Sequence, residues 1–209
     1  KNKVTEIKVN LDKENNKFSV YNNGIGIPIV EHQEHKIYIP ELIFGNLLTS
    51  SNYDKDEKKI TGGKNGYGAK LANIFSTKFK ITTIDHEKKL KYVQTFEKNM
   101  NIKNKPTITK CSEKPYTLIE FEPDLERFNI DKINSDTISL MQKRVYDCTA
   151  CTNKNVNVYL NDVKLDTKTL EKYVSYYFDD NVERVYEQIS NRWEVVMAVS
   201  PDAKFEHVS

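Results

Sequence analysis

The sequence predicts an α+β fold, in which a sheet built from hairpins packs against helices. Two pairs of segments with alternating apolar and polar residues, each pair separated by a polar turn, predict β-hairpins at residues 6–22 and 79–96. Residues 136–151 instead have apolar side chains at helical spacing, which predicts an amphipathic helix. A chain of 209 residues is long enough for one full domain and part of a second.

The first predicted hairpin ends in a polar residue that interrupts its apolar face. The apolar positions of this hairpin are Ile7, Val9, Leu11, Phe18 and Val20. Asn22 takes the next position on that face, directly before the segment Gly24-Ile25-Gly26-Ile27-Pro28. A turn-forming Asn would explain this position, because Asn-Asn-Gly favours tight turns. An amide that binds a ligand would explain it as well.

The rest of the chain predicts further short helices and strands. The predicted helices are 40–48, 67–76 and 136–151, the last with a stripe of Ile138, Met141, Val145 and Cys148. The predicted strands are 79–84, 90–96, 116–124, 156–160, which begins another hairpin, and 192–199. We expect a polar stretch at 49–61 and an Asn- and Lys-rich loop after residue 96. We also expect the partners of strand 192–199 to lie outside the chain, so that the chain ends within a second domain.

The composition is that of a packed globular protein with little net charge. Basic residues number 32 against 30 acidic ones, which gives a net charge of +2, and 38% of the residues are hydrophobic. The chain as a whole lacks the large positive charge that is typical of nucleic-acid-binding proteins. We therefore expect any role that involves DNA to be indirect. No apolar run reaches 18 residues, and the start lacks the apolar stretch of a signal peptide. We expect a soluble, intracellular protein with no membrane partner.

The three cysteines fit reduced thiols in the cytosol or nucleus. Cys148 and Cys151 have the spacing of half a zinc site, but the sequence has no second pair to complete a tetrahedron. A redox motif would begin a helix, whereas these cysteines end one. We therefore predict that they pack as small apolar side chains in the core.

A second glycine-rich segment, residues 61–70, reads Thr-Gly-Gly-Lys-Asn-Gly-Tyr-Gly-Ala-Lys. Its last three glycines have the spacing Gly-x-x-Gly-x-Gly, which excludes a Rossmann fingerprint. A P-loop is excluded because Ala69 takes the position of the P-loop lysine. The glycine N–H groups, the following helix, and nearby Lys64 and Lys70 favour a phosphate-binding nest of another kind. A flexible surface loop is the alternative.

A hydroxyl on a second strand makes the phosphate interpretation more attractive. Thr117 shares the predicted buried face of its strand with Ile119 and Phe121. The Asn22 amide and the Thr117 hydroxyl are groups that a pocket for the edge of an adenine base would use. Apolar walls for such a pocket would come from Ile27, Ile43 and Phe44.

With these segments in place, the sequence resembles the GHKL, or Bergerat-fold, ATPases, and specifically eukaryotic-type DNA topoisomerase II. The matching segments are Asn22-Asn23-Gly24-Ile25-Gly26-Ile27-Pro28, Leu47-Leu48-Thr49-Ser50-Ser51-Asn52-Tyr53, residues 61–70 continued by Asn73-Ile74-Phe75-Ser76-Thr77, and Arg192-Trp193-Glu194-Val195. The resemblance implies a two-layer sandwich of a mixed, mainly antiparallel sheet with helices on one face. Residues 1–170 would form the ATP-binding domain without its N-terminal helix. Residues 171–209 would form a linker and the truncated start of a transducer domain.

The resemblance also divides the predicted site into three groups of residues. The adenine pocket would consist of Asn22, which reads the base, Thr117, which supports it, and Ile27, Ile43 and Phe44. The ribose and phosphate contacts would come from Ser50, Ser51 and Asn52. The nest around the triphosphate would consist of Gly63, Lys64, Asn65, Gly66, Tyr67, Gly68, Ala69 and Lys70. The family commonly has Arg where this chain has Lys64, so a bidentate contact is not implied there.

Other parts of the family's catalytic machinery have no counterpart in these residues. Family members carry a Glu that activates the attacking water and an Asn that helps hold Mg²⁺ on a helix before the first hairpin, and a Lys on a later transducer loop. The resemblance therefore implies a chain that binds ATP but does not hydrolyse it alone. The full-length enzyme would be a nuclear homodimer, an isomerase that uses ATP and Mg²⁺ to close a gate and pass one DNA duplex through another.

Two other functions remain open at the level of sequence. Another GHKL protein, such as a MutL-like repair protein or gyrase B, would use the same pocket to drive a different clamp. That alternative lacks the segment Leu47-Leu48-Thr49-Ser50-Ser51-Asn52-Tyr53. A non-catalytic interaction module would instead present a partner surface formed by Tyr173, Tyr176, Tyr177 and Trp193, and it would not bind nucleotide.

Overall fold

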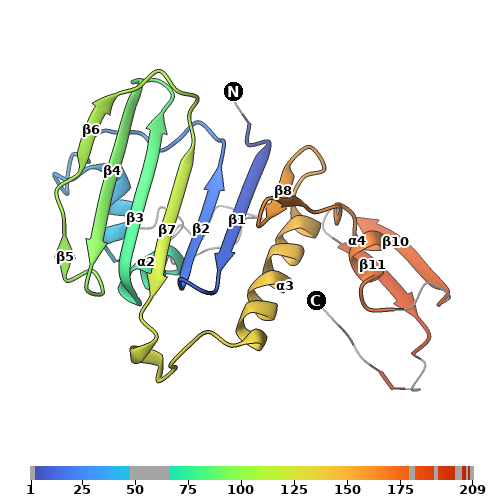
Figure 1. Ribbon diagram of the computed structural model, residues 1–209. Helices are drawn as coiled ribbons and strands as arrows, with labels where there is room; N and C mark the ends of the chain where they lie inside the picture. The colour runs from blue at the N-terminus through green and yellow to red at the C-terminus, as the bar shows by residue number, and fades with distance from the viewer. Residues whose placement is uncertain are drawn as a thin grey trace.

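The computed structural model describes residues 3–47, 66–178, 182–190, 193–200, 204–205 and 207. A nine-stranded sheet dominates this part of the chain, with the order β5-β4-β3-β7-β2-β1-β8-β9 and with β6 also paired to β4 (Figure 1). Its strands are β1 (Glu6–Asp12), β2 (Lys17–Asn22), β3 (Ser76–Asp85), β4 (Leu90–Glu97), β5 (Ile102–Lys103), β6 (Thr107–Lys110), β7 (Thr117–Pro123), β8 (Asn157–Leu160) and β9 (Val163–Lys164). Within the described sheet only β1 and β8 pair in parallel. The predicted mixed, mainly antiparallel sheet is confirmed.

Both predicted hairpins are present because their turns satisfy the backbone locally. In the first, the Asp12 carboxylate accepts the Asn15 N–H at 3.0 Å, and Asn16 adopts a left-handed conformation with φ of 49°. In the second, the strands extend a few residues beyond the predicted ends, because β3 begins at Ser76. The loop expected after residue 96 contains two short strands, β5 and β6, so that expectation was wrong there.

The helices in the described ranges are α1 (Ile39–Gly45), α2 (Gly68–Ile74), α3 (Ser135–Cys151) and α4 (Leu170–Val174), together with the 3₁₀ turn η2 (Glu126–Phe128). Pro40 suits the first turn of α1, and the Asn134 side chain caps α3 by accepting the Thr137 N–H at 2.8 Å. α1 ends at Gly45 rather than at residue 48, and α2 ends at Ile74 because the chain enters β3 two residues later. None of the helices in the described ranges is long and apolar enough to cross a membrane.

The strand register aligns three rows of residues across one face of the sheet. The first row is Phe96, Phe79, Phe121, Phe18 and Leu11. The second row is Gln94, Ile81, Ile119, Val20, Val9 and Leu160. The third row is Tyr92, Thr83, Thr117, Asn22, Ile7 and Val158, and it becomes polar in its centre. Because side chains alternate along a strand, all three rows share a face.

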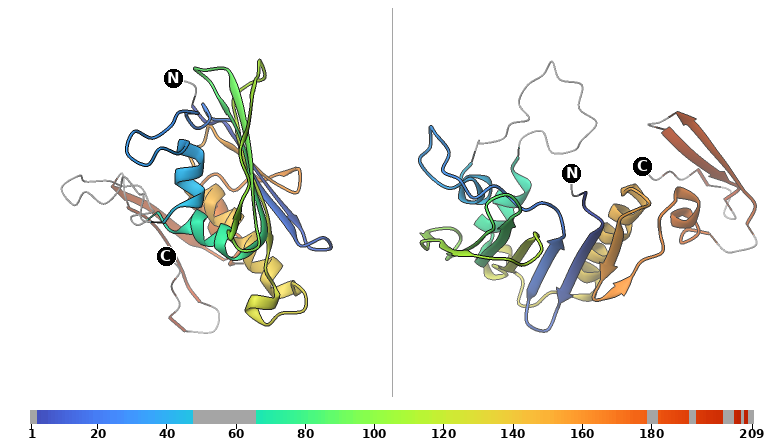
Figure 2. Two further views of the ribbon diagram at one scale, coloured as in Figure 1. Left: turned by 90° about the vertical axis from the view of Figure 1, so that its left-hand side faces the viewer. Right: turned by 90° about the horizontal axis from the view of Figure 1, so that it is seen from above.

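Helices cover this face in two separate places. α1 and α2 lie together on one face of the sheet (Figure 2), and Phe44 of α1 joins a buried cluster with Phe79, Ile81 and Phe96. α3 covers the other end through Val145, which packs in a second cluster with Val158, Leu160 and Leu165. Between the two clusters Val20 remains 42% exposed. Among the described residues, the helix layer is therefore open above β2.

The two cysteines at the end of α3 do not pack in the core as predicted. Cys148 and Cys151 are both exposed, and Cys111 is half-buried. Thr149 is the buried residue on this turn, because its hydroxyl donates to the Val145 carbonyl at 2.8 Å and leaves no polar group unpaired. The buried stripe of α3 therefore continues from Val145 to Thr149, at i+4, rather than to Cys148, at i+3.

A separate two-stranded sheet follows α4. It pairs β10 (Arg184–Ser190) with β11 (Trp193–Ala198), and Val185 lies opposite Met197. The expectation that strand 192–199 would find its partners only outside the chain was wrong, because β10 is one of them. Val185 and Met197 are nevertheless about three-fifths exposed.

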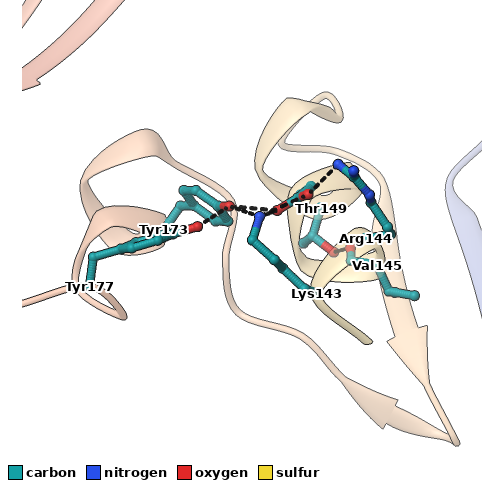
Figure 3. Close-up of polar contacts among 7 residues, drawn as sticks. Lys143, Arg144, Val145, Thr149, Tyr173 and Tyr177 are labelled. Atoms are coloured by element: carbon teal, nitrogen blue, oxygen red, sulfur yellow. Dashed lines mark hydrogen bonds and ion pairs between the residues drawn. The ribbon is translucent and has the colours of Figure 1, made fainter. Parts of the chain in front are cut away.

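A polar network joins α4 to α3 (Figure 3). The Asp147 carboxylate accepts hydrogen bonds from the Tyr173 hydroxyl at 2.5 Å and from Lys143 Nζ at 2.9 Å, and the Tyr173 hydroxyl lies 2.8 Å from that of Tyr177. Burial alone would raise the pKa of Asp147, but the hydrogen bonds from Tyr173 and Lys143 outweigh it and lower the pKa. Burial, reinforced by the bond to Asp147, raises the pKa of Tyr173 to about 12. The Asp147 carboxylate is thus ionised and Tyr173 protonated at neutral pH.

Candidate functional site

The polar centre of the third row is a short chain of hydroxyl and amide groups on β3, β7 and β2. Thr83 Oγ1 donates to the Tyr116 carbonyl at 3.1 Å and lies 3.0 Å from Thr117 Oγ1. Since a hydroxyl has a single proton, Thr117 must be the donor in the second contact. The oxygen of Thr117 then keeps lone pairs to accept from another group. Thr117 is buried, as its strand pattern predicted.

Asn22 is the next polar residue in this row, at the end of β2, and it fixes the turn that follows. It pairs with Thr117 across the sheet, and its Oδ1 accepts the Gly24 N–H at 3.2 Å. Both explanations that the sequence left open for Asn22 are therefore compatible with its position. The side chain supports the turn, and its amide also lies beside the Thr117 strand.

The glycine segment after Asn22 is fixed against the end of β3. Ile27 donates its N–H to Thr83 Oγ1 at 3.0 Å, and His86 donates its N–H to the Ile25 carbonyl at 3.0 Å. Gly26 lies between these contacts with φ of +78°, and a Cβ added there would be 1.8 Å from the Ile84 carbonyl oxygen. Only glycine allows the segment to approach the strand this closely.

Asp85 is the buried acceptor that completes this anchor. Its Oδ2 accepts the Ile29 N–H at 2.9 Å, and its Oδ1 accepts the N–H groups of Glu87 and Lys88 at 2.8 and 3.1 Å. Burial alone would raise its pKa, but these backbone hydrogen bonds lower it below the ordinary value. Sequence reasoning missed Asp85 and Thr83. The signal for Thr83 was the same as for Asn22, a polar residue at the end of an apolar strand face.

The described part of the second glycine segment leads directly into α2. Gly66 has φ of +65°, Gly68 opens the helix, and Lys70 is only 3% exposed. Burial lowers the pKa of the Lys70 ammonium group, because the charged form loses hydration. Tyr67 and Ala69 are exposed beside it. Of the other predicted site residues, Ser50, Ser51, Asn52, Gly63, Lys64 and Asn65 lie outside the described residues.

The three predicted walls of the base pocket differ in their surroundings. Phe44 is 8% exposed and packs on Phe79, with ring centroids 6.0 Å apart. Ile27 is half-buried against the same cluster, whereas Ile43, which precedes Phe44 on α1, is 39% exposed. The structure therefore brings Ile27 and Phe44 together and leaves Ile43 at the surface.

One group of side chains in the described ranges could hold a metal ion. His32, Glu34 and His35 offer ligand atoms within 4.8 Å of one another on an exposed turn. His32 Nδ1 already accepts the N–H groups of Glu34 and His35 at 3.3 and 3.4 Å. Mg²⁺ prefers an octahedron of oxygen ligands, so two imidazoles and one carboxylate do not fit it.

The comparison with known proteins gives one consistent result. The chain is 51% identical over 207 residues to a probable DNA topoisomerase 2 of Dictyostelium discoideum, an alignment that covers 97% of this chain. It superimposes on the ATPase region of Saccharomyces cerevisiae topoisomerase II with a TM-score of 0.90 and 48% identity over 94% of the chain. This chain belongs to the eukaryotic DNA topoisomerase II family. Its fold is accordingly that of the GHKL ATPases.

The match is to one region of much longer topoisomerase II chains. This chain spans 14% of the Dictyostelium relative and 53% of the solved yeast ATPase-region chain. It also covers 52% of a solved chain containing the ATPase and transducer domains of topoisomerase II from Balamuthia mandrillaris, with 42% identity and a TM-score of 0.89. No protein-family model matches the chain.

Proposed function

We propose that this chain is the ATP-binding module of the N-terminal gate of a DNA topoisomerase II. In the whole enzyme, ATP binding would close a homodimer and ATP hydrolysis would drive the passage of one DNA duplex through another. The observation that carries the proposal is the arrangement around the first glycine segment. Asn22 pairs with Thr117 across the sheet and accepts the Gly24 N–H, and the N–H groups of Ile27 and Ile29 bind Thr83 and Asp85 at the end of β3. The close similarity to solved topoisomerase II ATPase regions supports it.

The polar row supplies the chemistry that an adenine edge requires. Adenine presents an amino group that donates, and Asn22 Oδ1 and Thr117 Oγ1 are acceptors on neighbouring strands. Ile27 and Phe44 would form the apolar wall of the base pocket, with Ile43 at its rim. A base held by buried hydrogen-bonding groups is selected strongly, because an analogue without the amine leaves them unpaired.

The triphosphate would lie along the second glycine segment. Gly66 provides a left-handed backbone position, which exposes N–H groups to an anion, and Lys70 provides a cation at the start of α2. Burial of Lys70 strengthens its attraction for phosphate, since a partly desolvated charge is screened less. Ser50, Ser51, Asn52, Gly63, Lys64 and Asn65 complete the proposed contacts to the ribose and phosphates.

The domain boundary and the partners follow from the same proposal. Residues 1–170 would be the ATP-binding domain, and 171–209 a linker with the first strands of the transducer domain, which the separate β10–β11 sheet supports. The whole enzyme would be nuclear and dimeric, would bind DNA, and would use Mg²⁺ held by ligands outside this chain. The open helix layer above Val20 leaves room for the helix that carries the catalytic Glu in the family.

ATP binding is tested by calorimetry with a non-hydrolysable ATP analogue. We expect Asn22→Ala and Lys70→Ala each to weaken binding by roughly tenfold or more, since each removes a partly buried polar contact. Asn10→Ala and Lys78→Ala are matched controls, because Asn10 on β1 and Lys78 on β3 are both exposed. Both variants are expected to keep the affinity of the intact chain. Equal affinity in the intact chain and all four variants would disprove the pocket.

The same chain is expected not to turn ATP over. In the family, the general base, the metal ligand and the transducer lysine belong to segments that the resemblance does not match in these residues. Phosphoryl transfer depends on such groups, because they position the reactants and neutralise charge. Steady-state measurement of phosphate release by the purified 209-residue chain checks this expectation. Sustained turnover that co-purifies with the chain and is lost in Lys70→Ala would refute it.

A further inference from the structure

A buried amide connects the helix of the proposed base pocket to the helix of the phosphate site. Asn73 of α2 is fully buried, and its Nδ2 donates to the Phe44 carbonyl at 3.0 Å, near the end of α1. Lys70 lies one turn before Asn73 on the same helix. Phe44 and its neighbour Ile43 are the α1 residues of the proposed base pocket. One hydrogen bond thus spans the two halves of the nucleotide site.

The oxygen of the Asn73 amide lowers the stability of the fold. Asn73 Oδ1 is buried and finds no hydrogen-bond donor in the part of the chain that the structure describes. A buried acceptor without a partner destabilises the folded state, because it has lost its hydrogen bonds to water. A leucine of similar shape would avoid that cost. Retention of a half-satisfied amide in the core is typical of a position that serves function rather than stability.

The neighbouring carbonyl of α1 is held from a different direction. The Gly45 carbonyl accepts a hydrogen bond from Lys103 Nζ of β5 at 2.6 Å. A Cβ at Gly45 would lie 2.8 Å from the Phe96 ring, so this end of α1 rests closely on the sheet. Lys103 therefore ties α1 to the sheet, whereas Asn73 ties α1 to α2.

We propose that Asn73 is a positioning residue for ATP, which sets the distance between the base pocket on α1 and the phosphate site on α2. This inference rests on the proposed function of the site. A ligand that contacts both helices gains affinity when they are held in one arrangement, because the second contact is then made without further loss of freedom. Ligands that reach only one helix do not gain from the connection.

The test compares three ligands on Asn73→Leu and on a matched control, Lys103→Met. Calorimetry with the non-hydrolysable ATP analogue is expected to show roughly tenfold weaker binding to Asn73→Leu. Inorganic tripolyphosphate and adenosine, which contact one half of the site each, are expected to bind Asn73→Leu as they bind the intact chain. Lys103→Met loses a hydrogen bond to the adjacent α1 carbonyl and is expected to keep its affinity for all three ligands.

Folding is checked by thermal unfolding. The unfolding midpoint of Asn73→Leu is expected within about 4 °C of that of the intact chain, because the substitution removes the unpaired Oδ1 together with the hydrogen bond. Asn73→Ser, whose side chain is too short for the contact, serves if the leucine variant does not fold. Unchanged affinity of these variants for the ATP analogue, or equal losses for all three ligands or in Lys103→Met, overturns the inference. Absence of binding to the intact chain overturns the proposed function instead.

Discussion

Gly26→Ala is expected to lower the free energy of unfolding by about 2 kcal/mol or more. The residue has φ of +78°, and a Cβ there would lie 1.8 Å from the Ile84 carbonyl oxygen and 2.7 Å from its carbon. Both are backbone atoms of a central strand, so no side-chain rotation relieves the clash. For a chain of this size the loss corresponds to a fall of roughly 5 °C in the unfolding midpoint. Thermal unfolding followed by circular dichroism measures it.

Gly68→Ala is the matched control for this substitution. Gly68 belongs to the other glycine segment, has helical backbone geometry, and has nothing within 4 Å of the position of an added Cβ. Alanine is the better helix former, so we expect the midpoint of this variant to stay the same or to rise slightly. If both variants unfold at the same temperature, the close approach of Gly26 to β3 is wrong.

Asp85→Asn is expected to destabilise the fold by about 2–3 kcal/mol at pH 7. The carboxylate accepts three backbone N–H groups from both sides of the strand end. An amide in its place has a single oxygen, so its NH₂ group must face the N–H of either Ile29 or the Glu87–Lys88 turn. Urea unfolding of the two proteins at pH 7 measures the difference.

The effect of Asp85→Asn is also expected to depend on pH. Hydrogen bonds lower the folded-state pKa of Asp85 below its value in the unfolded chain, about 3.9. The carboxylate therefore contributes stability that is fully present above that unfolded value and is lost as the pH falls through the folded pKa. The gap between the two proteins should narrow below about pH 4.

Asp12 offers a matched control for Asp85 at an exposed turn. It accepts the Asn15 N–H in a similar arrangement and its pKa is lowered by the Asn15 side chain and backbone, but Asp12 is exposed whereas Asp85 is buried. Asp12→Asn is expected to lower the urea midpoint at pH 7 much less than Asp85→Asn does, because the exposed Asp12 carboxylate exchanges its hydrogen bonds with water. A constant gap between Asp85→Asn and the intact chain from pH 7 to pH 3 would contradict the assigned role of Asp85.

Alternation and turn chemistry were sufficient to predict the strands that have one buried face. The segments that became β1, β2, β3, β4 and β7 were recognised within a few residues, and Thr117 was correctly predicted to be buried. The strand β10 was missed because it has no buried face: most of its residues are exposed, and the charged Glu187 lies between Val185 and Ile189 on one face. Pattern reasoning detects burial rather than backbone pairing.

The groups that anchor the glycine segment depend on contacts between distant parts of the chain. Thr83 and Asp85 each bind a backbone N–H 56 residues earlier, and Asn73 binds a carbonyl 29 residues earlier. Nothing local distinguishes them from polar residues of an ordinary turn or helix. The error at Cys148 has a different origin, since positions i+3 and i+4 both continue a helical stripe, and only the packing of Thr149 decides between them.

The Asp147 network makes the junction of α3 and α4 respond differently to pH and to ionic strength. Its carboxylate and phenol keep the same protonation states from about pH 5 to pH 10, because the pKa of Asp147 is lowered and that of Tyr173 is raised to about 12. Acidity within that range leaves the junction of α3 and α4 untouched. Its ion pairs are partly exposed, however, and dissolved salt screens such pairs. Ionic strength rather than pH is the variable that loosens this junction while the two apolar clusters remain intact.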